Sequence, residues 1–372
     1  MSDRKLTILG IVAGVLLAVA VIQTKFSQTA APTYAGPTNL VQGFGDPGGI
    51  ATIQVSAEST SVTLKRQGDH FVVSDKDSYV AASKEINNLI NSCLDIKRGQ
   101  QITDNPENYE ELGITEETAR TRVTFLDGSD KEMLGVIIGD ARTEGQGSYV
   151  RLTSDPEVYV APSVPYLRTR PMDYVNKTLV EVLVDDIVRV AVTDPNGTYT
   201  LTKADGSIVL DEVGEGKQAR ESELKLVFES LASMECEDLQ RQGSGFNFDR
   251  SFVCELKNST IYTFLLAEKD GKTYASCSAE FADKTEVVKA STVESIEELE
   301  AKEAILLGRE GALNFVRRHT GWIYELPSYR ADRLTKAVSD LVEDIPAEEE
   351  ETVEEGLPAD PLELLSLPDG TE

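Results

Sequence analysis

The sequence predicts an α+β fold of tandem repeated units, each an antiparallel sheet plus one packing helix, after an N-terminal transmembrane helix. The first observation behind this prediction is an apolar spacing that occurs three times along the 372 residues. Each time, three apolar residues separated by nine and then seven positions precede a helical stripe. The trios are Val55, Leu64 and Phe71; Val192, Leu201 and Ile208; and Leu306, Phe315 and Trp322. A period of about 110 to 140 residues is typical of duplicated small domains rather than of a solenoid.

The helical stripes place apolar residues at positions i, i+3, i+4, i+7 and i+8, which is one face of an α-helix. They are Ile86, Leu89, Ile90, Cys93 and Leu94; Leu224, Val227, Phe228, Leu231 and Ala232; and Leu334, Ala337, Val338, Leu341 and Val342. We therefore expect helices over about residues 81–96 and 221–234, and a third helix from about residue 331. Each stripe would cover one face of its own sheet.

Alternation of apolar and polar residues predicts the strands. Repeat one spans residues 50–162 and repeat two spans residues 186–302, with a connector over 163–185. The expected strands are 53–55, 62–64, 71–73, 122–126, 134–138, 149–152 and 158–160 in repeat one, and 190–192, 199–203, 208–210, 252–256, 261–266, 274–277 and 286–290 in repeat two. Turns such as Asp127-Gly128 indicate antiparallel hairpins. A partial repeat three, residues 303–345, would supply three strands and a helix, leaving a sheet edge that needs a neighbour or a partner.

The start of the chain predicts a membrane anchor. From Leu6 to Ile22 there is no charged residue, and Arg4 and Lys5 precede this run. Such a run gives about 25 Å of helix, enough to cross a hydrocarbon core. A cleaved signal peptide is the competing interpretation, but the run is long for one, and Pro32 follows the nearest small-residue site. We expect a cytoplasmic segment at 1–5, an anchor at 6–24 and a Gly/Pro linker at 25–49, with the body outside the inner membrane.

The charge of the chain excludes one class of partner. Its formal net charge is −28, and such a surface repels phosphate backbones, so we expect no nucleic-acid binding. Many of the acids lie in residues 346–372, which are rich in Glu and Pro and predict a disordered, solvated tail. A docking tail is the alternative, in which the segment from Leu362 to Leu365 forms a short recognition helix.

The residues that carry chemistry form no catalytic or metal pattern. His70 and His319 fall in predicted hairpin turns away from any nucleophile motif, and no CxxC spacing occurs among Cys93, Cys236, Cys254 and Cys277. We therefore predict no catalytic, cofactor-binding or metal-binding residue.

Several residues that could be taken for functional ones have structural interpretations. Cys93 occupies a helical core slot, whereas Cys254 and Cys277 either form a disulfide or face opposite ways. Trp322, and Tyr324 with it, could form an aromatic platform, but the alignment of Trp322 with Phe71 favours the core. The Gly-rich stretch at 43–49 lacks the Lys-Ser/Thr ending of a phosphate loop and is expected to be linker.

Some segments resemble a known family. They are the Gly-Ser-Tyr-Val-Arg strand at 147–151, the Tyr-Leu-Arg segment at 166–168, and the Trp-led strand at 321–326 that feeds a helix at 331–334. With the anchored N-terminus, they resemble bacterial proteins of the domain-of-unknown-function family 4340 over about residues 50–340. The resemblance implies an accessory role facing the periplasm, since family members are often envelope proteins associated with ABC transporters of the gliding-motility type. Phe71 stands where Trp322 stands in the later copy, so the ring has no role common to every repeat.

Three functional hypotheses follow. The first is a non-enzymatic accessory, binding or scaffold subunit beside an ABC-type envelope transporter, with exposed sheet edges suited to β-addition. The second is an envelope hydrolase or glycan-processing enzyme that uses carboxylates alone. A set of carboxyl groups with raised pKa values around a shared pocket would favour it. The third is a structural spacer between membrane and wall, without a stable partner.

Overall fold

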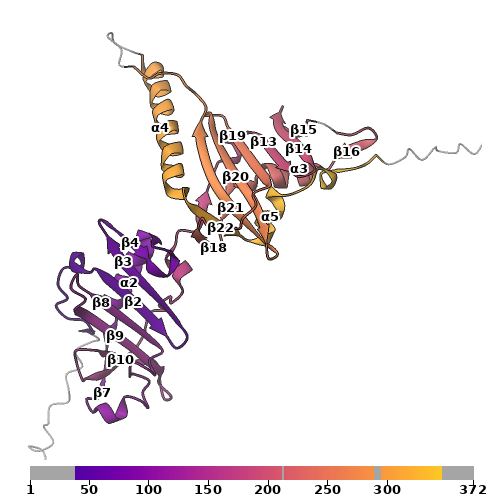
Figure 1. Cartoon of the computed structure of the whole chain (residues 1–372). Helices are drawn as coiled ribbons and strands as arrows, with labels where there is room; N and C mark the ends of the chain where they lie inside the picture. The colour runs from indigo at the N-terminus through magenta and orange to yellow at the C-terminus, as the bar shows by residue number, and fades with distance from the viewer. Residues whose placement is uncertain (1–37, 212, 289–294, 346–372) are drawn as a thin grey trace, which may run out of the picture. The chain divides into compact units, whose positions relative to one another are not determined.

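A computed structural model describes residues 38–211, 213–288 and 295–345 of the chain. The predicted anchor at 6–24 and the predicted acidic tail at 346–372 lie outside these residues. None of the helices within the described ranges is long and apolar enough to cross a membrane. The described residues form two compact units, an N-terminal unit of residues 38–179 with Glu235–Gln242 and a C-terminal unit made of the described residues of 180–234 and 243–345. Both are mixed α and antiparallel β (Figure 1), which confirms the α+β class.

The N-terminal unit is built on one antiparallel sheet in the order β5-β4-β3-β2-β8-β9-β10-β11-β7. Its strands are β2 (Thr52–Ala57), β3 (Thr60–Gln67), β4 (His70–Val73), β5 (Tyr79–Val80), β7 (Gln101–Thr103), β8 (Thr121–Leu126), β9 (Glu132–Ala141), β10 (Ser148–Leu152) and β11 (Val158–Ala161). A short ribbon pairs β1 (Thr38–Asn39) with β6 (Lys97–Arg98). The segment Glu235–Gln242 adds β18 (Asp238–Arg241), where Lys76 forms an ion pair with Asp238.

The core of this unit lies between the sheet and helix α2 (Ser83–Leu94). Val55 pairs with Val62, and Ile53 pairs with Leu64, so that period-2 alternation turns all four side chains to one buried face. The stripe of α2, which includes the fully buried Cys93, packs on the sheet at β4. The prediction that Cys93 is a core residue is therefore confirmed, and the predicted helix 81–96 is shorter by two residues at each end.

Part of the predicted linker is folded. Residues 38–49 include β1 and the 3₁₀-helix η1 (Pro47–Gly49), and Leu40 is buried. The Asp46 side chain accepts a hydrogen bond from the Gly48 amide at 2.8 Å. The Asp46 carboxylate therefore occupies a backbone amide that a phosphate loop would use to bind its ligand, and the Gly-rich stretch is a turn. The linker prediction is wrong for residues 38–49, because Leu40 and Ile50 supply apolar area that the core buries.

The C-terminal unit has a second antiparallel sheet, which contains the run β15-β14-β13-β19-β20-β21-β22. These strands are β13 (Ile187–Asp194), β14 (Gly197–Ala204), β15 (Ser207–Leu210), β19 (Arg250–Leu256), β20 (Thr260–Lys269), β21 (Lys272–Phe281) and β22 (Trp322–Leu326). Its helices are α3 (Glu221–Phe228), α4 (Ile296–His319) and α5 (Ser328–Leu334), and β16 (Lys217–Ala219) pairs with β23 (Val342–Asp344). The predicted helix 221–234 ends early, as α3 followed by the 3₁₀-helix η6 (Ser230–Ala232).

The remaining short elements are connections. The strands β12 (Thr178–Val180) and β17 (Met234–Glu235) lie where the chain passes from one unit to the other. Short 3₁₀-helices are η2 (Ser74–Lys76), η3 (Pro106–Asn108), η4 (Pro171–Tyr174), η5 (Val184–Asp186) and η7 (Val338–Asp340). The predicted strand at 286–290 does not form over residues 286–288, and positions 289 and 290 lie outside the described ranges.

The prediction of a partial repeat three is wrong. Leu306 and Phe315 do not lie on strands but on α4, a helix of 24 residues. The third helical stripe is also split, because α5 ends at Leu334, Val338 lies in η7 and Val342 lies in β23. The physical reason is that residues 296–319 consist largely of strong helix formers and begin with a capping box of Ser295 and Glu298. Trp322, on β22, belongs to the sheet that contains β21.

The structure also settles the remaining aromatic and cysteine predictions. Trp322 and Tyr324 are buried, so the core interpretation of Trp322 is confirmed. Cys254 on β19 pairs with Tyr262, and Cys277 on β21 pairs with Phe264, so β20 separates the two cysteines. Two strand spacings, about 9.5 Å, exceed the reach of a disulfide, and no bridge joins them. The alternative of a Cys254–Cys277 disulfide is therefore wrong.

Candidate functional site

The two histidines lie in different surroundings. His70 lies at the start of β4, and its Nδ1 is 2.9 Å from Oδ1 of the exposed Asp69. The hydrogen bond with His70 lowers the pKa of Asp69 below its ordinary value. His319 is buried at the end of α4, with Nδ1 2.8 Å from the Tyr324 hydroxyl oxygen and its ring centroid 4.2 Å from that of Phe315. An aromatic, hydrogen-bonded environment of this kind is typical of a core histidine.

Carboxyl groups with clearly shifted pKa values do not gather around one pocket. In the described part of the chain these are Asp69, Asp127, Asp185 and Asp283, and each pKa is lowered. The first cause in every case is a hydrogen bond from a neighbouring side chain, which stabilises the ionised form. A general acid needs the opposite shift, towards the working pH. These four carboxyl groups therefore offer no support for the hydrolase hypothesis.

One cleft of the C-terminal unit is lined by two aspartates, and both carboxylates are engaged in hydrogen bonds that hold the local backbone or a neighbouring side chain. It has a volume of about 810 Å³ and lies between the β13–β14 hairpin and η7. Oδ1 of Asp194 accepts hydrogen bonds from the amides of Asn196 at 2.7 Å and Gly197 at 2.9 Å. Oδ1 of Asp211 accepts one from the Thr202 hydroxyl at 3.2 Å. Asp194 thus closes the hairpin turn, and within the described ranges no group of three or more acidic, His or Cys side chains is placed to hold a metal ion.

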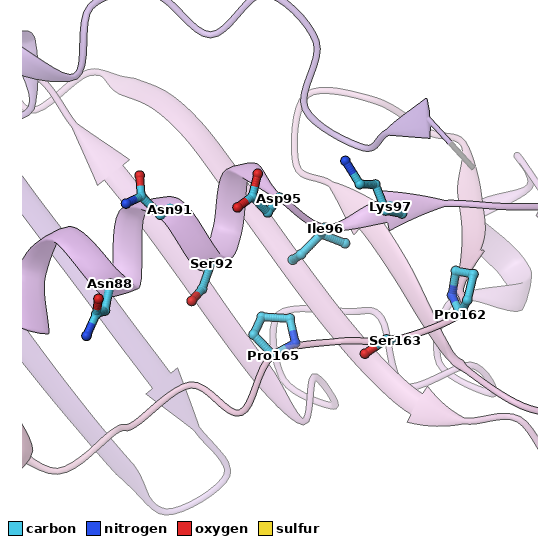
Figure 2. Close-up of a pocket in the computed structure, with 9 residues that line it drawn as sticks. All are labelled: Asn88, Asn91, Ser92, Asp95, Ile96, Lys97, Pro162, Ser163 and Pro165. Atoms are coloured by element: carbon cyan, nitrogen blue, oxygen red, sulfur yellow. The ribbon is translucent and has the colours of Figure 1, made fainter. Parts of the chain in front are cut away.

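A second polar cleft lies in the N-terminal unit, along the exposed face of α2 (Figure 2). It has a volume of about 650 Å³ and polar as well as apolar walls. Asn88, Asn91, Ser92 and Asp95 lie along the helix at i, i+3, i+4 and i+7, which is the side opposite the core stripe. The other lining residues are Ile96, Lys97, Pro162, Ser163 and Pro165.

The far wall of the cleft is held in place by backbone hydrogen bonds. The Gly99 amide donates to the Val160 carbonyl at 2.8 Å, and the Leu40 amide donates to the Ile96 carbonyl at 2.7 Å. Arg98 donates to the Tyr159 hydroxyl at 2.9 Å, and its guanidinium lies over that ring. The contacts of Gly99 and Arg98 attach β11, the strand that leads into Pro162, to the chain that leaves α2. Figure 2 shows the two sides of the cleft, with Asn88 and Ser92 on α2 and Pro162, Ser163 and Pro165 opposite.

The chemistry of the cleft favours a neutral, hydrogen-bonding ligand. Asn88, Asn91 and Ser92 each offer both donors and acceptors, and none carries a charge. The cleft has one carboxylate, Asp95, and one ammonium group, Lys97, whose Nζ already donates to Asn39. A phosphate ligand would need more cationic donors than this arrangement supplies. The prolines and Ile96 add apolar surface between the polar groups.

The edges of both sheets are poorly suited to the β-addition that the sequence suggests. In the N-terminal unit the edge strands β5 and β7 contain two and three residues, and β15 in the C-terminal unit contains four. Such short edges present few free backbone groups to an incoming strand. The cleft on α2 is therefore a better candidate for partner binding than either edge.

Comparison with known proteins identifies one match. Residues 72–249 match a family model described as "Domain of unknown function (DUF4340)". Neither the curated proteins nor the solved structures contain a significant match. The matched region contains α2 and every residue that lines the polar cleft, and it excludes α4.

Proposed function

We propose that this chain, which belongs to the DUF4340 family through residues 72–249, is a non-enzymatic binding subunit of an ABC-type envelope transport system. It is anchored in the inner membrane by residues 6–24, and its body faces the periplasm. The observation that carries the proposal is the polar cleft on α2, which lies wholly inside the matched region. Because every residue that lines the cleft lies within the region that matches the family model, the cleft is a candidate for a function of that domain.

The occupant we propose for the cleft is an extended segment of a transporter subunit. A peptide main chain presents alternating N–H and C=O groups, which side chains such as Asn88, Asn91 and Ser92 can satisfy in either sense. From Asn88 to Asp95 the helix rises about 10 Å, the length of about three extended residues. Ile96 and the two prolines would receive the apolar side chains of such a segment. The cleft has one acidic and one basic side chain, Asp95 and Lys97, and this balance suits the uncharged main chain of a peptide.

The N-terminal sequence supports the proposed location. The uncharged run from Leu6 to Ile22 is long enough for a single span, and Arg4 and Lys5 favour a cytoplasmic N-terminus. N-terminal sequencing of the mature protein tests this part. A chain that retains residues 6–24 supports the anchor, whereas a chain that begins near Pro32 or Gly36 contradicts it.

We further infer that the two units arose by duplication. In both, three antiparallel strands follow one another and lead to a helix: β2, β3, β4 and then α2, and β13, β14, β15 and then α3. The nine-and-seven spacing of the first two apolar trios falls on these strands. With the apolar stripes of the two helices aligned, Leu226, Glu229 and Ser230 occupy the positions of Asn88, Asn91 and Ser92, so the two amides of the cleft have no counterpart in the C-terminal unit.

Affinity purification from gently solubilised membranes tests the function. The full-length wild-type chain should retain transporter subunits, and Asn88→Ala with Asn91→Ala should lose most of them. Both side chains are exposed and alanine favours helix, so this double variant should keep its fold. Asn87→Ala is the matched control, since Asn87 is an exposed asparagine of α2 that does not line the cleft.

Two results would count against the proposal. If the wild type retains no transporter subunit, the accessory role fails. If the double variant and Asn87→Ala retain equal amounts of partner, the cleft is not the binding site. Circular dichroism of the variants confirms that any loss of binding does not come from loss of the helix.

A further inference from the structure

Helix α4 carries a regular stripe of exposed leucines. Leu299, Leu306 and Leu313 are 51%, 52% and 56% exposed, and each lies seven residues after the one before. Single exposed apolar residues are ordinary on protein surfaces. A seven-residue spacing is different, because it keeps the side chains on nearly one line along the helix, which is one of the two apolar lines in a coiled-coil heptad. The stripe lies outside the residues that match the family model.

The rest of α4 is already occupied by its own unit. The helix packs along β21 (Figure 1), and Ala312 and His319 are buried on that side. The Phe315 ring lies edge-on to Tyr262, with ring centroids 5.0 Å apart. Arg309 donates to the Asp283 carbonyl at 3.5 Å. The leucine stripe lies to one side of this attachment and stays open to solvent in the described structure.

Charge along α4 is divided between its two halves. Residues 296–307 contain four glutamates and one lysine, whereas residues 308–319 contain three arginines and one glutamate. This order also suits the dipole of the helix itself. It has a second consequence for association, because a copy of α4 that runs in the opposite direction places acidic half against basic half. A parallel copy would place like charges together.

We propose that α4 pairs with α4 of a second copy of this chain in antiparallel orientation, with the two-fold axis near residues 309 and 310. In this register Leu306 lies opposite the partner's Leu313, and the reverse contact follows by symmetry. Glu303 lies within one residue of the level of the partner's Arg317, and the two-fold axis repeats this complementary pair at the other end of the contact. At the axis, Glu310 lies close to the partner's Glu310, which is a like-charge approach.

A second copy fits this stripe better than a lipid surface. The four glutamates in its first half would repel anionic headgroups. The seam is also self-complementary in spacing and in charge, which a contact with an unrelated helix would not require. The inference is independent of the proposed function, since α4 contributes nothing to the cleft on α2.

Disulfide trapping in the full-length chain tests both the dimer and its direction. Glu310→Cys should give a covalent dimer on mild oxidation, because the two introduced thiols meet at the axis. Glu303→Cys is the matched control on the same side of the helix, and its two thiols would be about 20 Å apart along the antiparallel pair. Trapping through 310 but not through 303 supports the proposal. Trapping through both positions indicates a parallel pair and overturns the register.

Mass measurement by light scattering tests the surface in the untrapped chain. Leu306→Glu with Leu313→Glu should raise the dimer dissociation constant about a hundredfold or more, because two apolar layers become repulsive. Leu307→Glu is the control, since this leucine is 60% exposed but points about 100° away from Leu306. A monomeric wild-type chain overturns the proposal, and so does a double variant that dimerises as the wild type does.

Discussion

Two glycines of α4 offer a sharp test of how this helix packs. Gly308 faces the sheet, and a Cβ added there would lie 2.8 Å from Cδ2 of Phe281 and still closer to Cε2. Gly311 is exposed, and a Cβ added there meets no atom within 4 Å. Because both glycines lie in the interior of the same helix, alanine brings both the same gain in helix propensity. Any difference between the two variants therefore reports the contact with Phe281.

The size of the difference follows from two opposing effects. Replacing Gly by Ala in a helix interior stabilises it by about 1 kcal/mol. Forcing an extra methyl group into packed surroundings costs about 1–3 kcal/mol. We expect Gly311→Ala to raise the free energy of unfolding by about 1 kcal/mol, and Gly308→Ala to lower it by about 0–2 kcal/mol. The difference between the variants is then about 1–3 kcal/mol.

Urea unfolding followed by tryptophan fluorescence measures this difference. Trp322 is the single tryptophan of the chain, and it is buried on β22 of the same unit, so its emission reports the C-terminal unit selectively. Both variants are compared at one protein concentration, because association shifts apparent stability. Equal stabilisation by the two alanines would refute the reasoning, since it would mean that α4 does not rest on Phe281 in solution.

Two further predictions concern groups with shifted pKa values. The pKa of Asp127 is lowered first by the Ser129 hydroxyl, so an NMR titration should give a midpoint below 3.8 that rises in Ser129→Ala; an unchanged midpoint would contradict this cause. Since the folded-state pKa is the lower one, the stabilisation is present above the unfolded value and is lost as pH falls through the folded pKa. Burial raises the pKa of the Cys93 and Cys254 thiols to about 12, so both should resist alkylation at pH 8 in the folded chain and react in urea. Rapid labelling of either thiol without urea would show that its part of the core opens.

Much of the fold could be predicted from local sequence patterns. Period-2 alternation at Ile53 and Val55, or at Val190 and Val192, directly reflects one buried sheet face, so strands placed from it are close to the observed ones. The third apolar trio misled because spacing alone does not distinguish strand from helix. The composition around Leu306, rich in Glu, Ala, Leu and Arg, and the capping box at Ser295 were the signals that favoured a helix.

The candidate site could not be predicted in the same way. In the sequence, Asn88, Asn91 and Ser92 have the pattern of the solvated face of an amphipathic helix. Their role depends on a wall at Pro162 and Pro165, about 70 residues later in the chain. Only the pairing of strands brings that wall to α2, and no local pattern contains this information. A stripe of amides at helical spacing was visible, but its meaning depends on the tertiary fold.

The two proposals together make a prediction that neither makes alone. A dimer formed through α4 presents two clefts, so a membrane with clustered transporter subunits would bind it with an avidity that one cleft cannot supply. Leu306→Glu with Leu313→Glu should then release the chain from such membranes while leaving the one-to-one affinity for an isolated partner subunit unchanged. Asn88→Ala with Asn91→Ala should weaken both kinds of binding. If the leucine variant instead loses one-to-one affinity, α4 itself contacts the partner, and the cleft is not sufficient for recognition.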